Sequence, residues 1–129
     1  LRWKKADKAK EIIDEIFMFD CTENALKLVA RTAIKFQGKK IVYDDLLKYV
    51  KNPSSGRSEV EDYIGELIDE LNYYFERMEN YIEIDYINFD DIKPSFEWYI
   101  HQIRGDRLDF INYAKTSGYK RCAKFFDRF

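Results

Sequence analysis

The chain has little of what metal and redox chemistry needs. Among its 129 residues there is one histidine, His101, and there are two cysteines. Cys21 and Cys122 lie far apart and form no C-x-x-C pair, so we expect buried free thiols in a reducing compartment, with a disulfide as the alternative. One histidine without a cysteine cluster cannot assemble a typical transition-metal site. The sequence therefore predicts no metal ion and no other cofactor.

Glycine and proline are also scarce, with five and two residues. This scarcity favours long helices over short strands joined by turns. No apolar run reaches the ~18–20 residues that a membrane-spanning helix needs, and no secretory signal pattern is present. The chain also has no G-x-x-x-x-G-K-[ST] phosphate loop and no G-x-S-x-G nucleophile elbow. We therefore expect a helical protein that is not an enzyme.

What the chain does contain is apolar and aromatic surface. It is 46% hydrophobic and 17% aromatic, which is enough to build a core at this length. We expect residues 1–129 to form one helical domain. Because the chain begins with Leu1 rather than Met, we also expect it to be a piece of a longer protein.

Charge is distributed unevenly along the sequence. Residues 1–10 carry a net charge of +4, residues 57–97 a net charge of −10, and residues 98–129 a net charge of +4. This pattern allows both ends to fold back on the middle. It argues against a dedicated nucleic-acid domain, which would present a coherent basic face.

The stretch from Ser58 to Ile82 predicts the central helix. On a helical wheel its apolar side chains fall on one face, and Ser58 can cap its N-terminus. The inward positions are Val60, Ile64, Leu67, Ile68, Leu71, Tyr74, Phe75, Met78 and Ile82. The opposite, solvated face holds Asp62, Glu66, Asp69, Tyr73 and Glu76. The many carboxylates of this stretch are therefore predicted to lie on the wet side rather than to form a chemical site.

The flanking segments predict further helices and no sheet. Residues 1–20 form an amphipathic helix. A second helix starts after the N-cap Thr22, buries Ala33 and Phe36, and ends at Gly38. A short extended lead-in and a short helix follow within residues 39–52, and residues 52–58 form a loop. Another helix runs from Asn88 or Pro94 to Arg104, and the last two are split at Ser117–Gly118. The predicted fold is an all-α bundle of five to seven helices.

Partner contacts are predicted mainly on aromatic side chains. Trp98 points away from the inward positions Phe96, Tyr99, Ile100 and Ile103, and Tyr73 lies on the acidic back of the central helix. Tyrosine and tryptophan are enriched at interfaces, where an apolar body meets a polar rim. Glu97 and His101, spaced i,i+4, complete the predicted contact residues. The competing hypothesis is an enzyme with Glu97, His101 or Cys122 in a cleft, although Cys122 has the spacing of a core residue.

The basic ends carry the second functional hypothesis. The first comprises Arg2, Trp3, Lys4 and Lys5, and the second comprises Lys120, Arg121 and Lys124. Together they can bind the phosphates of a nucleic acid. The N-terminal group also suits a membrane surface, where cationic residues and an interfacial tryptophan meet lipid headgroups, and a solvated helix end is the equally good alternative.

The run "LNYYFERMENYIEIDYINFDDIKPSFEWYI" resembles a bacterial family of all-helical domains of unknown function. The resemblance covers Glu59 to Phe129 and rests on apolar spacing with a few residue types. Members often follow membrane-spanning helices, so it implies a cytoplasmic domain tethered to the inner face of a membrane. It also implies an anti-phage or mobile-element context. The function predicted from all of this is a non-catalytic protein-interaction or regulatory domain, with self-association as one form and nucleic-acid binding as the alternative.

Overall fold

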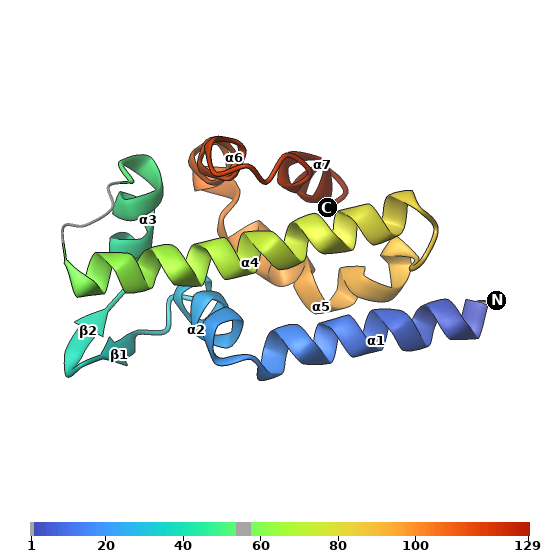
Figure 1. Cartoon of the computed structure of the whole chain (residues 1–129), viewed down its shortest axis with the longest axis horizontal. Helices are drawn as coiled ribbons and strands as arrows, with labels where there is room; N and C mark the ends of the chain where they lie inside the picture. The colour runs from blue at the N-terminus through green and yellow to red at the C-terminus, as the bar shows by residue number, and fades with distance from the viewer. Residues whose placement is uncertain (1, 54–57) are drawn as a thin grey trace.

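The computed structural model describes residues 2–53 and 58–129, without the side chain of residue 2. Within them the chain forms seven α-helices and one two-stranded hairpin (Figure 1). The elements are α1 (Arg2–Met18), α2 (Asp20–Val29), β1 (Ile34–Phe36), β2 (Lys39–Ile41), α3 (Tyr43–Lys51), α4 (Glu59–Glu83), α5 (Phe89–Gln102), the 3₁₀ helix η1 (Arg104–Asp106), α6 (Arg107–Thr116) and α7 (Cys122–Asp127). The predicted all-helical bundle is confirmed. Most of the predicted loop at 52–58 lies outside the described residues.

Helix α4 is the spine of the bundle. It crosses the molecule with α1 and α2 on one side and α3, α6 and α7 on the other (Figure 1), and it packs against α1, α2, α3 and α7. The Ser58 hydroxyl accepts a hydrogen bond from the Glu61 N–H at 3.1 Å, as a capping residue should. Of the predicted inward positions only Val60 and Ile82 are half-buried, and the others are buried.

Aromatic rings join the far end of α4 to α5 and α7. The Phe75 ring lies 6.2 Å from Phe96, 5.1 Å from Phe125 and 5.5 Å from Phe126, measured between centroids. All four side chains are buried. Such offset and edge-to-face pairs stabilise a core beyond the area that they bury. The inward position predicted for Phe96 is confirmed.

The predicted helix from Thr22 to Gly38 is wrong in its second half, because α2 ends at Val29. The N–H of Arg31 bonds to the carbonyl of Leu28 at 2.9 Å, and that of Thr32 to the carbonyl of Lys27 at 2.8 Å. These two bonds form a Schellman C-cap, in which the residue after the cap adopts a left-handed conformation. Arg31 has φ +66°. No glycine marks this helix end in the sequence.

Residues 34–41 form a hairpin, with Ile34 paired to Ile41 and Phe36 to Lys39. Helix was predicted wrongly for its first strand, whereas the extended segment predicted after Gly38 is present as β2. Gln37 and Gly38 make its two-residue turn with φ values of +51° and +78°. Such turns need positive φ at both central residues, so Gly38 marks a turn and not a helix end. Ala33 is exposed, contrary to the prediction.

Thr22 is not an N-cap either, since α2 already begins at Asp20. Its side chain is fully buried, and its hydroxyl donates to the Ile16 carbonyl at 2.5 Å and lies 3.1 Å from the Phe19 carbonyl. A threonine hydroxyl can satisfy backbone carbonyls at a helix end as well as N–H groups. Thr22 therefore ties the end of α1 to the start of α2.

Gly65 sets the distance between α3 and α4. A Cβ atom at this position would lie 2.4 Å from the Tyr49 hydroxyl oxygen and 2.9 Å from Cζ. We expect Gly65→Ala to lower the free energy of unfolding by about 1–3 kcal/mol, because Tyr49 must move out of a packed position. In a Tyr49→Leu background, Gly65→Ala should raise the free energy of unfolding by about 0.5–1 kcal/mol, because alanine has the higher helix propensity. Urea unfolding of the four proteins checks this, and a stabilising Gly65→Ala in both backgrounds would contradict it.

Candidate functional site

The two predicted aromatic contact residues are exposed. Trp98 is 53% exposed and Tyr73 is 48% exposed. The Trp98 ring lies edge-on to Tyr99 with centroids 5.2 Å apart, and Tyr73 lies edge-on to Tyr74 at 5.4 Å. Each ring is therefore held by a neighbour that packs into the bundle. Trp98 and Tyr73 remain predicted contacts.

Glu97 and His101 lie on the same helix but have different surroundings. The Glu97 carboxylate pairs with the Lys93 ammonium at 3.4 Å. His101 is exposed on the rim of a small pocket of about 80 Å³, beside Arg104 and Arg107. The structure does not bring Cys122 to this pocket.

Cys122 is instead fully buried against α4. Its thiol donates a weak hydrogen bond to the Asn72 carbonyl at 3.4 Å. Burial, followed by the nearby Glu76 charge, raises the pKa of Cys122 to about 12. A thiol in this setting stays protonated at neutral pH, and the thiolate is the reactive form. The position predicted from its spacing, a core residue, is what the structure shows.

The N-terminal basic group lies at the start of α1. The Lys5 ammonium pairs with Asp85 at 2.7 Å, so α1 is tied to the end of α4. The Lys4 ammonium lies 5.5 Å from the centre of the Trp3 ring, and Trp3 is 61% exposed. The side chain of residue 2 lies outside the described part. Of the cations in this group, Lys5 is thus already paired within the chain.

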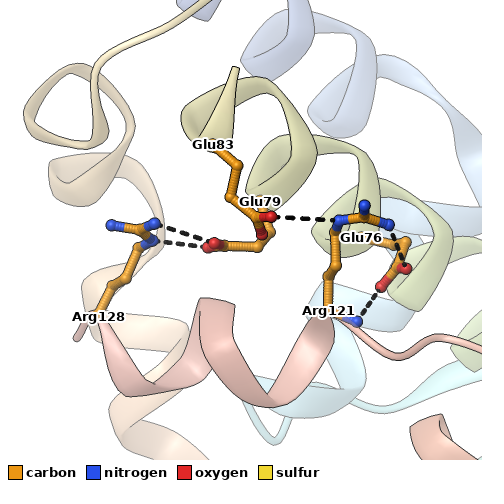
Figure 2. A network of polar contacts seen from close by, with 5 residues as sticks. All are labelled: Glu76, Glu79, Glu83, Arg121 and Arg128. Atoms are coloured by element: carbon orange, nitrogen blue, oxygen red, sulfur yellow. Dashed lines mark hydrogen bonds and ion pairs between the residues drawn. The ribbon is translucent and has the colours of Figure 1, made fainter. Parts of the chain in front are cut away.

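The C-terminal basic group is joined to α4 by a network of ion pairs (Figure 2). Arg128 binds the Glu79 carboxylate through two nitrogens, at 2.6 and 2.9 Å. Arg121 lies 3.5 Å from Glu76 and 3.6 Å from Glu83 through its side chain, and its backbone N–H donates to Glu76 at 2.5 Å. The C-terminal end therefore folds back on the acidic helix, as the charge pattern allows.

This network corrects the view that the carboxylates of α4 all lie on the wet side. Glu79 is 1% exposed and faces α7 rather than water. Asp69, placed on the solvated face by the helical wheel, accepts a hydrogen bond from the Tyr113 hydroxyl at 2.7 Å. Helix α7 and the end of α6 cover part of the face that an isolated helix would expose.

A larger recess lies at the other end of α4, between the hairpin, α3 and the first turns of α4. It has a volume of about 570 Å³. Four lysines line it, two from β2 and two from α3, and Tyr49, Val60 and Ile64 are its aromatic and apolar residues. The lysines are Lys39, Lys40, Lys48 and Lys51. We call this recess the lysine groove.

The carboxylates of the lysine groove serve helix caps and do not neutralise the lysines. Asp45 accepts a hydrogen bond from the Val42 N–H at 2.9 Å, at the start of α3. Glu61 accepts one from the Ser58 hydroxyl at 3.1 Å, at the start of α4. Within residues 2–53 and 58–129, none of the four lysines makes an ion pair.

The lysine groove was not predicted from the sequence, because a helix over residues 30–37 leaves no hairpin beside α3. The lysines come in two pairs, Lys39 with Lys40 and Lys48 with Lys51, and seven residues separate the pairs. Only the hairpin turns the first pair toward α3. The spacing of Lys48 and Lys51, i,i+3 on one helix face, was the only local signal for part of the groove.

Neither a metal cluster nor a membrane-spanning helix is found in the described part of the chain. No group of three or more histidine, cysteine, aspartate or glutamate side chains there is arranged to hold a metal ion. No helix among the same residues is both long and apolar enough to cross a membrane. Comparisons with protein-family models, curated proteins and solved structures give no match to this chain.

Proposed function

We propose that this chain is a non-catalytic interaction domain that holds an anionic partner in the lysine groove. The observation that carries the proposal is the set of four lysines from β2 and α3 around one recess, without ion pairs in the described residues. Some cations at the two ends of the chain already form ion pairs within it. Lys5, Arg121 and Arg128 pair with carboxylates in or just after α4. The groove is thus a place where four lysines without ion pairs in the described residues surround one recess.

The hairpin brings lysine side chains close together, and their mutual repulsion does not stabilise the fold. Lys35 lies directly opposite Lys40 in the strand register, and Lys39 is the next residue. Like charges in opposite positions of a strand pair destabilise it. A bound anion would remove that repulsion, which supports binding as the role of these residues.

The acidic surface elsewhere favours the groove over other faces as the docking place. The net charge of the chain is −2, although five lysines and two aspartates lie between residues 35 and 51. The four lysines of the groove outnumber its two carboxylates, Asp45 and Glu61, and a cleft with an excess of one sign of charge concentrates ions of the opposite sign. An anionic partner would therefore be steered to the groove and repelled from the acidic faces.

Heparin chromatography tests this function with two variants of equal net charge. K39Q/K40Q/K48Q/K51Q removes the groove lysines. K10Q/K115Q/K120Q/K124Q removes four exposed lysines that make no ion pair in the described residues. A charge contact is worth about 1 kcal/mol in water, so we expect the loss of four lysines to weaken binding by about tenfold or more and the groove variant to elute at lower salt. Elution of both variants at the same salt would overturn the proposal.

A further inference from the structure

We infer that the partner in the lysine groove is a single-stranded nucleic acid, its phosphates on the lysines and a base against Tyr49. The inference rests on the proposed function, and it names the partner of the same site. It differs from the nucleic-acid hypothesis drawn from the sequence, because it uses none of the residues at the two ends of the chain. Three features of the groove support this inference: the lysines of β2 and α3 on its two sides, its volume, and the ring of Tyr49 in its lining.

The charged walls suit a polymer that passes through the recess. Lys39 and Lys40 come from β2, and Lys48 and Lys51 come from one face of α3. Lysine carries a compact charge on a flexible stem. Lysines from two elements can therefore follow successive phosphates without fixed geometry, which a backbone of variable conformation requires.

The groove has the volume of a small-molecule pocket. Its volume of about 570 Å³ falls within the ~300–1,000 Å³ typical of small-molecule pockets. A recess of this size receives part of a flexible strand. A duplex has its charges on the outside of a stiff cylinder and would meet only the rim. The size thus favours a single strand over a duplex.

The floor supplies an aromatic surface. Tyr49 is half-buried, and its ring is held 5.7 Å from the Tyr113 ring, while its hydroxyl reaches the backbone of Gly65. Val60 and Ile64 lie beside it in the groove. Proteins that bind single strands combine a basic groove with aromatic rings on which bases stack. The carboxylates of an acidic peptide and the phosphate of a lipid headgroup are not attached to a flat ring that would stack there, whereas every nucleotide carries one.

Fluorescence anisotropy with labelled oligo(dT) and oligo(U) decamers tests the inference in 50 to 300 mM NaCl. Single strands release about 0.7 counterion per phosphate contact. We expect K39Q/K40Q/K48Q/K51Q to weaken binding at least about tenfold and to reduce the slope of log affinity against log salt by about 3. Tyr49→Leu should weaken binding about fivefold or more and leave the slope unchanged, because stacking carries no charge. K10Q/K115Q/K120Q/K124Q serves as the charge-matched control.

The wild-type protein provides a second measurement, in case Tyr49→Leu does not fold. Addition of oligo(dT) should shift the NMR signals of the Tyr49 ring protons through the ring current of a stacked base. Three outcomes would overturn the inference and leave the proposed function standing, provided that the groove variant still elutes early from heparin: a duplex of equal length that binds as tightly, anionic lipid vesicles that bind more tightly, or an unshifted Tyr49. Equal heparin elution of the two lysine variants would instead remove the proposed function, and the inference with it.

Discussion

Replacing Arg128 with leucine is expected to lower the free energy of unfolding by about 2–4 kcal/mol. The guanidinium is the counter-charge of Glu79, whose side chain is 1% exposed. Without it, the carboxylate of Glu79 stays unpaired in the interior, and Arg121 is already placed between Glu76 and Glu83 (Figure 2). An unpaired buried charge is among the most costly changes that one substitution can make.

Replacing the partner of Arg128, by Glu79→Leu, should lower the free energy of unfolding by less, about 1 kcal/mol. The Arg128 side chain is 34% exposed, so it can turn toward water when its partner is removed. The double variant should regain most of the loss, because an apolar pair can replace a buried ion pair at little cost. Urea unfolding of the three variants gives the coupling energy between the two positions.

The exposed cation Lys124, also on α7, provides the control. Lys124→Leu should change stability by less than about 0.5 kcal/mol, because it makes no ion pair within the described residues. Equal losses for Arg128→Leu and Glu79→Leu would contradict the account, since they would mean that the carboxylate is no more costly to leave unpaired than the guanidinium.

Local signals in the sequence were sufficient for most of the helices. The α4 stripe repeats at helical spacing over the whole element, Ser58 caps it, and Gly118, with φ +93°, ends α6 where a glycine was expected. Each of these features is decided within a few residues of the chain. That is why periodicity and capping residues were enough to find them.

The errors arose where distant residues decide the structure. Arg31 ends α2 in a conformation that usually calls for glycine, and the buried pair of Ile34 and Ile41 stabilises the hairpin through contacts with the bundle. Glu79 looks like a solvated residue of an acidic helix until Arg128 is folded against it. The lysine groove likewise exists only after the hairpin and α3 have packed beside α4.

Raising the pH above 10 is expected to unfold the protein through three tyrosines. Tyr43, Tyr74 and Tyr113 donate their hydroxyl hydrogens to Asp106, Glu15 and Asp69, at 2.7, 3.0 and 2.7 Å. Burial, followed by the hydrogen bond to Glu15, raises the pKa of Tyr74 to about 12. Burial and the bonded carboxylates raise the pKa values of Tyr43 and Tyr113 further.

The sign follows from proton binding. A tyrosine in the unfolded chain has a pKa near 10, so above this pH the folded state holds protons that the unfolded state has lost. The free energy of unfolding must then fall as the pH rises from about 10 toward the folded pKa values. Each tyrosine contributes about 2 kcal/mol by pH 12, and the three together about 6 kcal/mol, which is comparable with the ~5–15 kcal/mol stability of a typical domain.

Tyr74→Phe separates this effect from the general loss of lysine charge at high pH. The variant should lose about 2 kcal/mol less than the wild type between pH 9 and pH 12, measured by urea unfolding at each pH with tyrosinate absorbance at 295 nm. Tyr73→Phe is the matched control, because the neighbouring side chain is 48% exposed and meets water in both states. Parallel pH curves for Tyr74→Phe and the wild type would show that the buried hydroxyl beside Glu15 does not control alkaline unfolding. If Tyr74→Phe loses less stability at high pH than the wild type and Tyr73→Phe does not, that part of the alkaline unfolding is due to the hydrogen bond from Tyr74 on α4 to Glu15 on α1.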